Sequence, residues 1–115
     1  LSIYQELLNR REEPIKILML IARQFRIIMQ VKELSKHGYT NRQIASQVGL
    51  HPYAVTIAQK QTKNYSIRQL NWILERLANA DYQMKTGQMD KILVVEMLLL
   101  ELAHSQSKAA ALSHG

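Results

Sequence analysis

Apolar residues recur at intervals of three and four along most of the chain, and no segment alternates between apolar and polar positions. This period predicts helices and no strands. The longest such pattern runs from Pro14 to about His37, with apolar residues on most of its circumference: Ile17, Leu18, Leu20, Ile21, Phe25, Ile27, Ile28, Val31 and Leu34. One polar stripe interrupts them, made of Lys16, Arg23, Arg26, Gln30 and Glu33. Such a helix is expected to have neighbours on more than one side.

Glycines and capping residues predict where the helices begin and end. Pro14 suits the first turn of the long helix, and Gly38 is expected to end it in the left-handed conformation. Thr40 and Gln43 form a capping box for a helix of about two turns, which ends at Gly49.

Three further helices follow from the same signals. One is expected over 52–63, with these residues facing inward: Ala54, Val55, Ile57 and Ala58. A second capping box, Ser66 with Gln69, opens a helix to about Lys85, whose buried face is Ile67, Leu70, Ile73, Leu74, Leu77 and Met84. Asp90 is expected to cap the last helix, 91–103, which is apolar almost all round.

Together these patterns predict an all-α fold, a compact bundle of five to six helices that includes a helix-turn-helix-like pair. A short amphipathic helix over 2–9 would be the first of them. We expect residues 1–104 to form one domain, a fragment of a longer subunit, since the chain begins with Leu1. Residues 105–115 are expected to be a polar tail, either a frayed extension of the last helix or not native.

Composition narrows the class of protein without naming a function. The chain has 115 residues, of which 47% are apolar, enough for one core. It has no cysteine and no apolar run of membrane-spanning length, so a reducing, cytoplasmic location is expected. The net charge of +6 is uneven: residues 1–75 carry 11 Lys and Arg against 5 Asp and Glu, whereas residues 76–115 carry 4 of each kind. This imbalance permits contact with nucleic acid or an acidic protein.

The segment QIASQVGLHPYAV, residues 43–55, has the spacing of a helix-turn-helix. Ala45 allows close approach of two helices, Gly49 suits the turn, and Val55 packs between the helices. A DNA reader presents Arg, Lys, Asn, Gln or Ser from the first turns of its second helix. Here that turn offers His51 and Tyr53, with no bidentate partner for a base. The spacing therefore leaves open a DNA-binding domain or a pair of helices that only pack together.

Residues for catalysis or cofactor binding do not gather in the sequence. There is no glycine-rich phosphate loop followed by Lys and Ser or Thr. The histidines, His37, His51, His104 and His114, have no pair at helical ligand spacing with a third ligand. We therefore expect no catalytic residue, no cofactor and no metal in this chain.

Four segments of the chain, taken together and in the same order, resemble the C-terminal domain of the delta subunit of bacterial DNA polymerase III, a clamp-loader protein. They are EEPIKILMLIARQFRIIMQVKEL (12–34), IASQVGLHPYAV (44–55), YSIRQLNWILERLANADYQMKTG (65–87) and VVEMLLLEL (94–102). The resemblance implies an all-helical collar domain that packs in a ring with the collars of other clamp-loader subunits, delta-prime and gamma/tau. It also implies that clamp binding and ATP hydrolysis belong to other domains and subunits of a loader that places the sliding clamp on primed DNA.

With that resemblance, the helix-turn-helix spacing is best explained by packing within the collar. Arg23 and Arg26 on the polar stripe, Trp72 on a polar helix face and the exposed Tyr53 are then candidate partner contacts. Lys85 and Lys91, beside the turn at Gly87, are candidate contacts to primed DNA and at most secondary. The sequence leaves open whether the fragment alone is a monomer or a homodimer.

Overall fold

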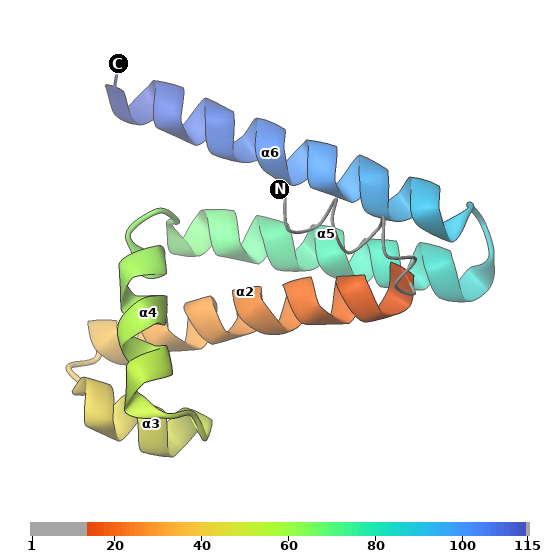
Figure 1. Cartoon of the computed structure of the whole chain (residues 1–115). Coiled ribbons are helices and arrows are strands. Elements are labelled where there is room, and N and C mark those ends of the chain that lie inside the picture. The colour runs from red at the N-terminus through yellow and green to blue at the C-terminus, as the bar shows by residue number, and fades with distance from the viewer. Residues whose placement is uncertain (1–13, 115) are drawn as a thin grey trace. The chain divides into compact units, whose positions relative to one another are not determined.

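The structure, a computed structural model, describes the backbone of residues 14–114 and the side chains of residues 14–104. The helices in that part of the chain are α2 (Pro14–Lys36), α3 (Asn41–Val48), α4 (Pro52–Thr62), α5 (Ile67–Thr86) and α6 (Lys91–His114) (Figure 1). Residues 14–114 contain no strand, so the all-α prediction is confirmed. The helix expected over 2–9 lies outside the described residues.

The chain divides into two compact units, which are described separately. The α5–α6 unit contains residues 75–114 together with residues 14–20 at the start of α2. The helix-turn-helix unit contains Ile21–Leu74, and therefore the rest of α2, α3, α4 and the start of α5. Among the described helices, none is both long and apolar enough to cross a lipid bilayer.

Helix α2 begins at Pro14 as predicted, and Gly38 follows its end with a φ of 86°. Most of the residues expected in its core are fully covered, among them Ile17, Leu18, Ile21, Phe25, Ile28 and Val31. Leu20 is a correction, since its side chain is 58% exposed. It lies four residues after the exposed Lys16, and residues four apart share a helix face. The side chain of Leu20 therefore faces solvent although it is apolar.

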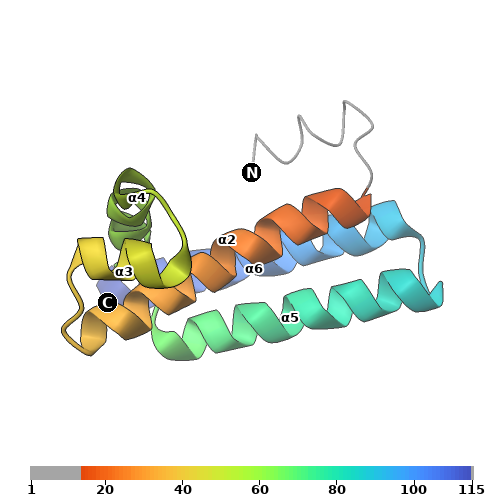
Figure 2. The ribbon, with the colours of Figure 1, turned by 90° about the horizontal axis from the view of Figure 1, so that it is seen from below.

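The helix-turn-helix-like pair is present and closely follows the prediction. Thr40 caps α3 in a complete capping box with Gln43, and Gly49 ends that helix with a φ of 76°. Pro52 begins α4, and the His51 side chain accepts a hydrogen bond from the backbone N–H of Tyr53. Both helices lie beside the C-terminal half of α2 (Figure 1, Figure 2). One apolar cluster joins the three: Val31, Ile44, Ala45, Val55 and Ala58.

Polar side chains fix how α4 lies against α2. Gln24 donates to the Gln61 side chain at 2.7 Å, and Lys32 donates to the backbone carbonyl of Thr62 at 3.0 Å. Lys32 thus supplies a cation and a donor to the C-terminal carbonyls of α4, where both are favourable. Ile57, expected to face this core, is 42% exposed. It follows Val55 by two positions, which places it roughly 200° further around the helix and nearly opposite the buried face.

Helices α5 and α6 begin at the predicted caps. Ser66 and Gln69 form the second capping box, with N–H donors 2.8 and 3.0 Å from their acceptors. Asp90 accepts from the backbone N–H of Leu93 at 3.2 Å. Of the residues predicted for the buried face of α5, four are fully buried: Leu70, Ile73, Leu77 and Met84.

Helix α6 continues to His114, well beyond the predicted end at Ala103. The prediction placed the end where the apolar pattern stops. Residues 105–114 nevertheless contain good helix formers, including the run from Lys108 to Leu112, and this segment has no glycine or proline. The proposed division between domain and tail at residue 104 stays a prediction.

Candidate functional site

A groove runs between the polar stripe of α2 and the turn that follows α3, entirely within the helix-turn-helix unit. Its hollow has a volume of about 290 Å³. We call it the Arg groove and define it by its lining residues: Arg23, Arg26, Ile27, Gln30, Val48, Gly49 and Leu50. The sequence named two of these, the arginines, as candidate partner contacts, but it gave no sign that the turn at Gly49 lies opposite them.

The Arg groove combines an apolar floor with a cationic edge. Ile27, Val48 and Leu50 are partly buried and pack against the cluster that joins α2, α3 and α4. The side chains of Arg23 and Arg26 are exposed and make no hydrogen bond or ion pair with any other described residue. Both guanidinium groups are therefore available to a carboxylate or phosphate from outside.

A second hollow of about 480 Å³ continues from the Arg groove, since Gln30 and Val48 line both. Its other lining residues are Glu33, Leu34, His37, Tyr39 and Gln47. Glu33 is exposed, and the His37 ring contacts the Glu33 backbone carbonyl at 2.8 Å. The polar stripe of α2 thus changes from cationic at Arg23 and Arg26 to anionic at Glu33.

The N-terminus of α4 does not present the side chains of a base-reading helix. His51 uses its Nδ1 atom to cap the helix, and Tyr53 stands 68% exposed. Lys60 and Lys63 are exposed, but they lie at the opposite end of α4. The cations are therefore placed away from the turn that would enter a major groove.

Trp72, on α5, is neither buried nor freely exposed. Its side chain is 37% exposed, and it makes a polar or ring interaction with its surroundings. A partly covered Trp is compatible with a local packing role and with a partner contact. Its assignment as a partner contact stays a prediction.

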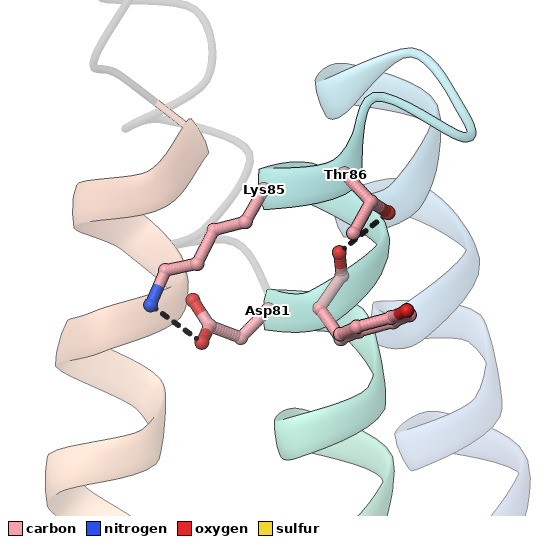
Figure 3. Close-up of polar contacts among 4 residues, drawn as sticks. Asp81, Lys85 and Thr86 are labelled. Carbon is pink, nitrogen blue, oxygen red and sulfur yellow. Dashed lines mark hydrogen bonds and ion pairs between the residues drawn. The ribbon is translucent and has the colours of Figure 1, made fainter.

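Lys85 and Lys91 flank the turn between α5 and α6, as the sequence indicates. Lys85 Nζ lies 2.9 Å from Asp81 Oδ2, an ion pair along the helix surface (Figure 3). The Thr86 hydroxyl donates to the Tyr82 carbonyl at 2.8 Å. Lys91 is exposed at the start of α6. An exposed pair of this kind is weak, so it reduces the availability of Lys85 without removing it.

An exposed apolar strip on α6 was missed at the sequence level. The α6 strip consists of Ile92, Leu93, Met97 and Leu100, which are 51, 44, 44 and 71% exposed. The opposite side of the helix is buried through Val94, Val95, Leu98 and Leu102. The signal for the strip was the near-complete apolar circumference of this helix, since a helix that packs on one side leaves part of such a circumference exposed. Within the described residues, no group of three or more metal-ligating side chains gathers.

Comparison with known proteins identifies the family. The sequence profile described as the DNA polymerase III delta subunit, C-terminal domain, matches residues 1–102. The chain belongs to this family. The resemblance drawn from four sequence segments is therefore confirmed.

A sequence match and a solved structure, both from Bacillus subtilis, show this similarity. The chain is 45% identical over 108 residues to the DNA polymerase III subunit delta of strain 168, covering 94% of this chain and 31% of that protein. It also superimposes on the solved structure of the Bacillus subtilis DNA clamp loader delta protein with a TM-score of 0.84 and 46% identity, covering 88% of this chain and 30% of that one. The chain thus spans about a third of the length of these delta subunits.

Proposed function

We propose that this chain is the collar domain of a clamp-loader delta subunit, and that it joins other loader subunits in a ring. Delta-prime and gamma/tau are the proposed neighbours. The loader held together in this way places the sliding clamp on primed DNA during replication. The proposed role of this chain is assembly, and no reaction is proposed for it.

The exposed α6 strip is the observation that carries this proposal. Monomeric proteins rarely leave a continuous stripe of large apolar side chains in water, and such stripes mark protein interfaces. Leu93, Met97 and Leu100 lie at spacings of four and three, so they share one face of α6. A helix face of this kind suits packing against a helix of a neighbouring subunit.

Four other side chains are proposed as partner contacts. Arg23 and Arg26 have free guanidinium groups, and Tyr53 is the most exposed aromatic residue near the turn. Trp72 would serve as an anchor that becomes fully covered on assembly, since Trp, Tyr and Arg dominate interface energetics. Lys85 and Lys91 remain proposed as secondary contacts to primed DNA.

The alternative function, a helix-turn-helix domain that reads DNA, is not favoured. The pair α3–α4 shares the apolar cluster with α2, which accounts for its spacing, and the first turn of α4 lacks base-reading side chains. Lys32, a further cation of this unit, is used internally to bond the end of α4.

The proposal can be tested by size-exclusion chromatography with light scattering. The chain would be measured alone, and then with delta-prime and with gamma/tau. We expect a new co-eluting complex with at least one of them. If neither complex forms, and the chain instead binds duplex DNA in a salt-sensitive manner, the DNA-binding alternative replaces the proposal.

A further inference from the structure

Arg23 and Arg26 differ from three neighbouring polar side chains, Gln24, Lys32 and Gln59, in making no hydrogen bond to any other described residue. Gln24 and Lys32, on the same helix, bond to the last turn of α4 at 2.7 and 3.0 Å. Gln59 bonds to the Ser35 and Asn41 side chains at 3.1 and 3.0 Å. The packing of α4 is thus complete without Arg23 and Arg26, which leaves both guanidinium groups for a contact outside the chain.

The groove beside these arginines is formed by rigid elements. Arg23 and Arg26 are three residues apart on α2, so they project from neighbouring positions of one face. The opposite wall is the turn at Gly49 and Leu50, held by hydrogen bonds of 2.9 Å from both N–H groups to the Ala45 carbonyl. These bonds hold the backbone of the turn beside α2, so the loss of freedom on filling the groove falls mainly on the two arginine side chains.

We propose that the Arg groove receives an acidic segment of a neighbouring clamp-loader subunit. Asp or Glu carboxylates of that segment pair with Arg23 and Arg26, and an adjacent apolar side chain covers Val48 and Leu50. This inference rests on the proposed assembly function and names the chemistry of one of its contacts. The planar guanidinium fork matches a carboxylate in a bidentate pair, which a surface lysine could not reproduce.

Two features favour an acidic protein segment over a nucleic-acid backbone. The floor between the arginines and the turn is apolar, and phosphates and sugars offer no apolar side chain to cover it. Glu33 is exposed on the same stripe of α2 and lines the hollow that continues from the groove. A phosphate chain that followed the stripe would therefore meet a like charge, because every nucleotide carries a phosphate, whereas a protein segment can place a neutral or cationic side chain opposite Glu33.

The test uses the full-length delta protein that contains this chain, assembled with delta-prime and with gamma/tau. The variant is the double charge reversal Arg23→Glu with Arg26→Glu. The matched control is Arg68→Glu, since Arg68 is exposed on α5 of the same unit and does not line the groove. We expect the double reversal to weaken binding of one neighbour about tenfold or more, and the control to change it about twofold at most.

Two further measurements keep the result interpretable. The double variant Arg23→Lys with Arg26→Lys keeps both charges but loses the planar guanidinium fork. Its affinity for the neighbouring subunit should therefore lie between those of the wild type and the double reversal. Circular dichroism and thermal melting would show that the variants fold. If the double reversal fails to fold, the double variant Arg23→Gln with Arg26→Gln takes its place, and we expect it to weaken binding of the same neighbour.

The outcomes separate the inference from the function on which it rests. If the wild-type protein binds neither neighbour, the assembly function is wrong. If the wild type binds and the reversal binds as well as Arg68→Glu does, the Arg groove is not a contact, although assembly stands. If the reversal leaves the complexes intact but lowers affinity for duplex DNA, the groove receives phosphate and the inference is overturned.

Discussion

Gly49 shows how one residue determines the helix-turn-helix-like pair. Its φ of 76° lies in the left-handed region, where a side chain costs free energy because Cβ crowds the following carbonyl. A Cβ built at this position meets nothing within 4 Å. Any cost of a side chain here is therefore conformational, and steric overlap with neighbouring atoms contributes nothing.

Substitutions at Gly49 can measure the free-energy cost of this left-handed conformation. We expect Gly49→Ala to lower the free energy of unfolding by about 1–2 kcal/mol, the usual cost of the left-handed conformation for a residue with Cβ. Gly49→Asn should cost less, because Asn tolerates this conformation. Urea denaturation of the three proteins would measure the difference. A larger loss for Asn than for Ala would contradict this, because it would show that space, and not the backbone angle, limits this position.

At the scale of elements, α3 and α4 depend on the shared cluster more than on their own helix propensity. Helix α3 has 8 residues, and helices shorter than about 12–15 residues are marginal in water without tertiary contacts. The capping box at Thr40 aids the start of α3, but Ile44 and Ala45 attach it to α2 and α4. The stability of the pair is thus mainly a property of its packing.

Two isoleucines in this pair provide a matched test. Ile44 is 0% exposed, whereas Ile57 is 42% exposed. We expect Ile44→Ala to lower the free energy of unfolding by about 2–5 kcal/mol, through lost burial and a cavity. Ile57→Ala should change it by about 0.5 kcal/mol or less. Chemical denaturation of both variants would check this, and a large loss for Ile57→Ala would contradict the exposed position of its side chain.

At the scale of the whole molecule, the unusual feature is the amount of apolar surface left in water on α6. Leu93, Met97 and Leu100 form its continuous part, and the exposed Glu101 borders them beside Met97. The exposed Glu96 lies between Ile92 and Leu100, four residues from each, so a contact there would combine an apolar face with one carboxylate inside it.

The α6 strip should affect association far more than folding. We expect Leu93→Ser with Leu100→Ser to weaken binding to loader subunits about tenfold or more, while thermal stability changes little because both side chains are already exposed. Ile57→Ser is the control, with a similar side chain and a 42% exposed fraction. Isothermal titration calorimetry with light scattering would measure affinity and oligomeric state. Unchanged affinity in the double variant would remove the strip from the interface.

Much of the fold could be predicted because its signals are local. Capping boxes, Pro14, Pro52 and left-handed glycines act within a few residues, and the structure has them where the sequence indicated. The errors have another origin. For Leu20 and Ile57, apolar character was equated with burial, but burial depends on which side of a helix meets a neighbour, and for the same reason the α6 strip was not predicted. That information is not contained in any short segment.

The candidate site, like the fold, has some features that the local sequence predicts and others that depend on how the helices pack. Apart from the end of α6, the sequence alone determined the helices, their caps, the helix-turn-helix spacing and the cationic stripe with Arg23 and Arg26, because each depends on residues close together in the chain. Only the tertiary structure decided that the turn at Gly49 and Leu50 faces those arginines across an apolar floor, and that Lys32 is used by the end of α4. These contacts join residues far apart in the chain, and the packing of helices around a shared core creates them.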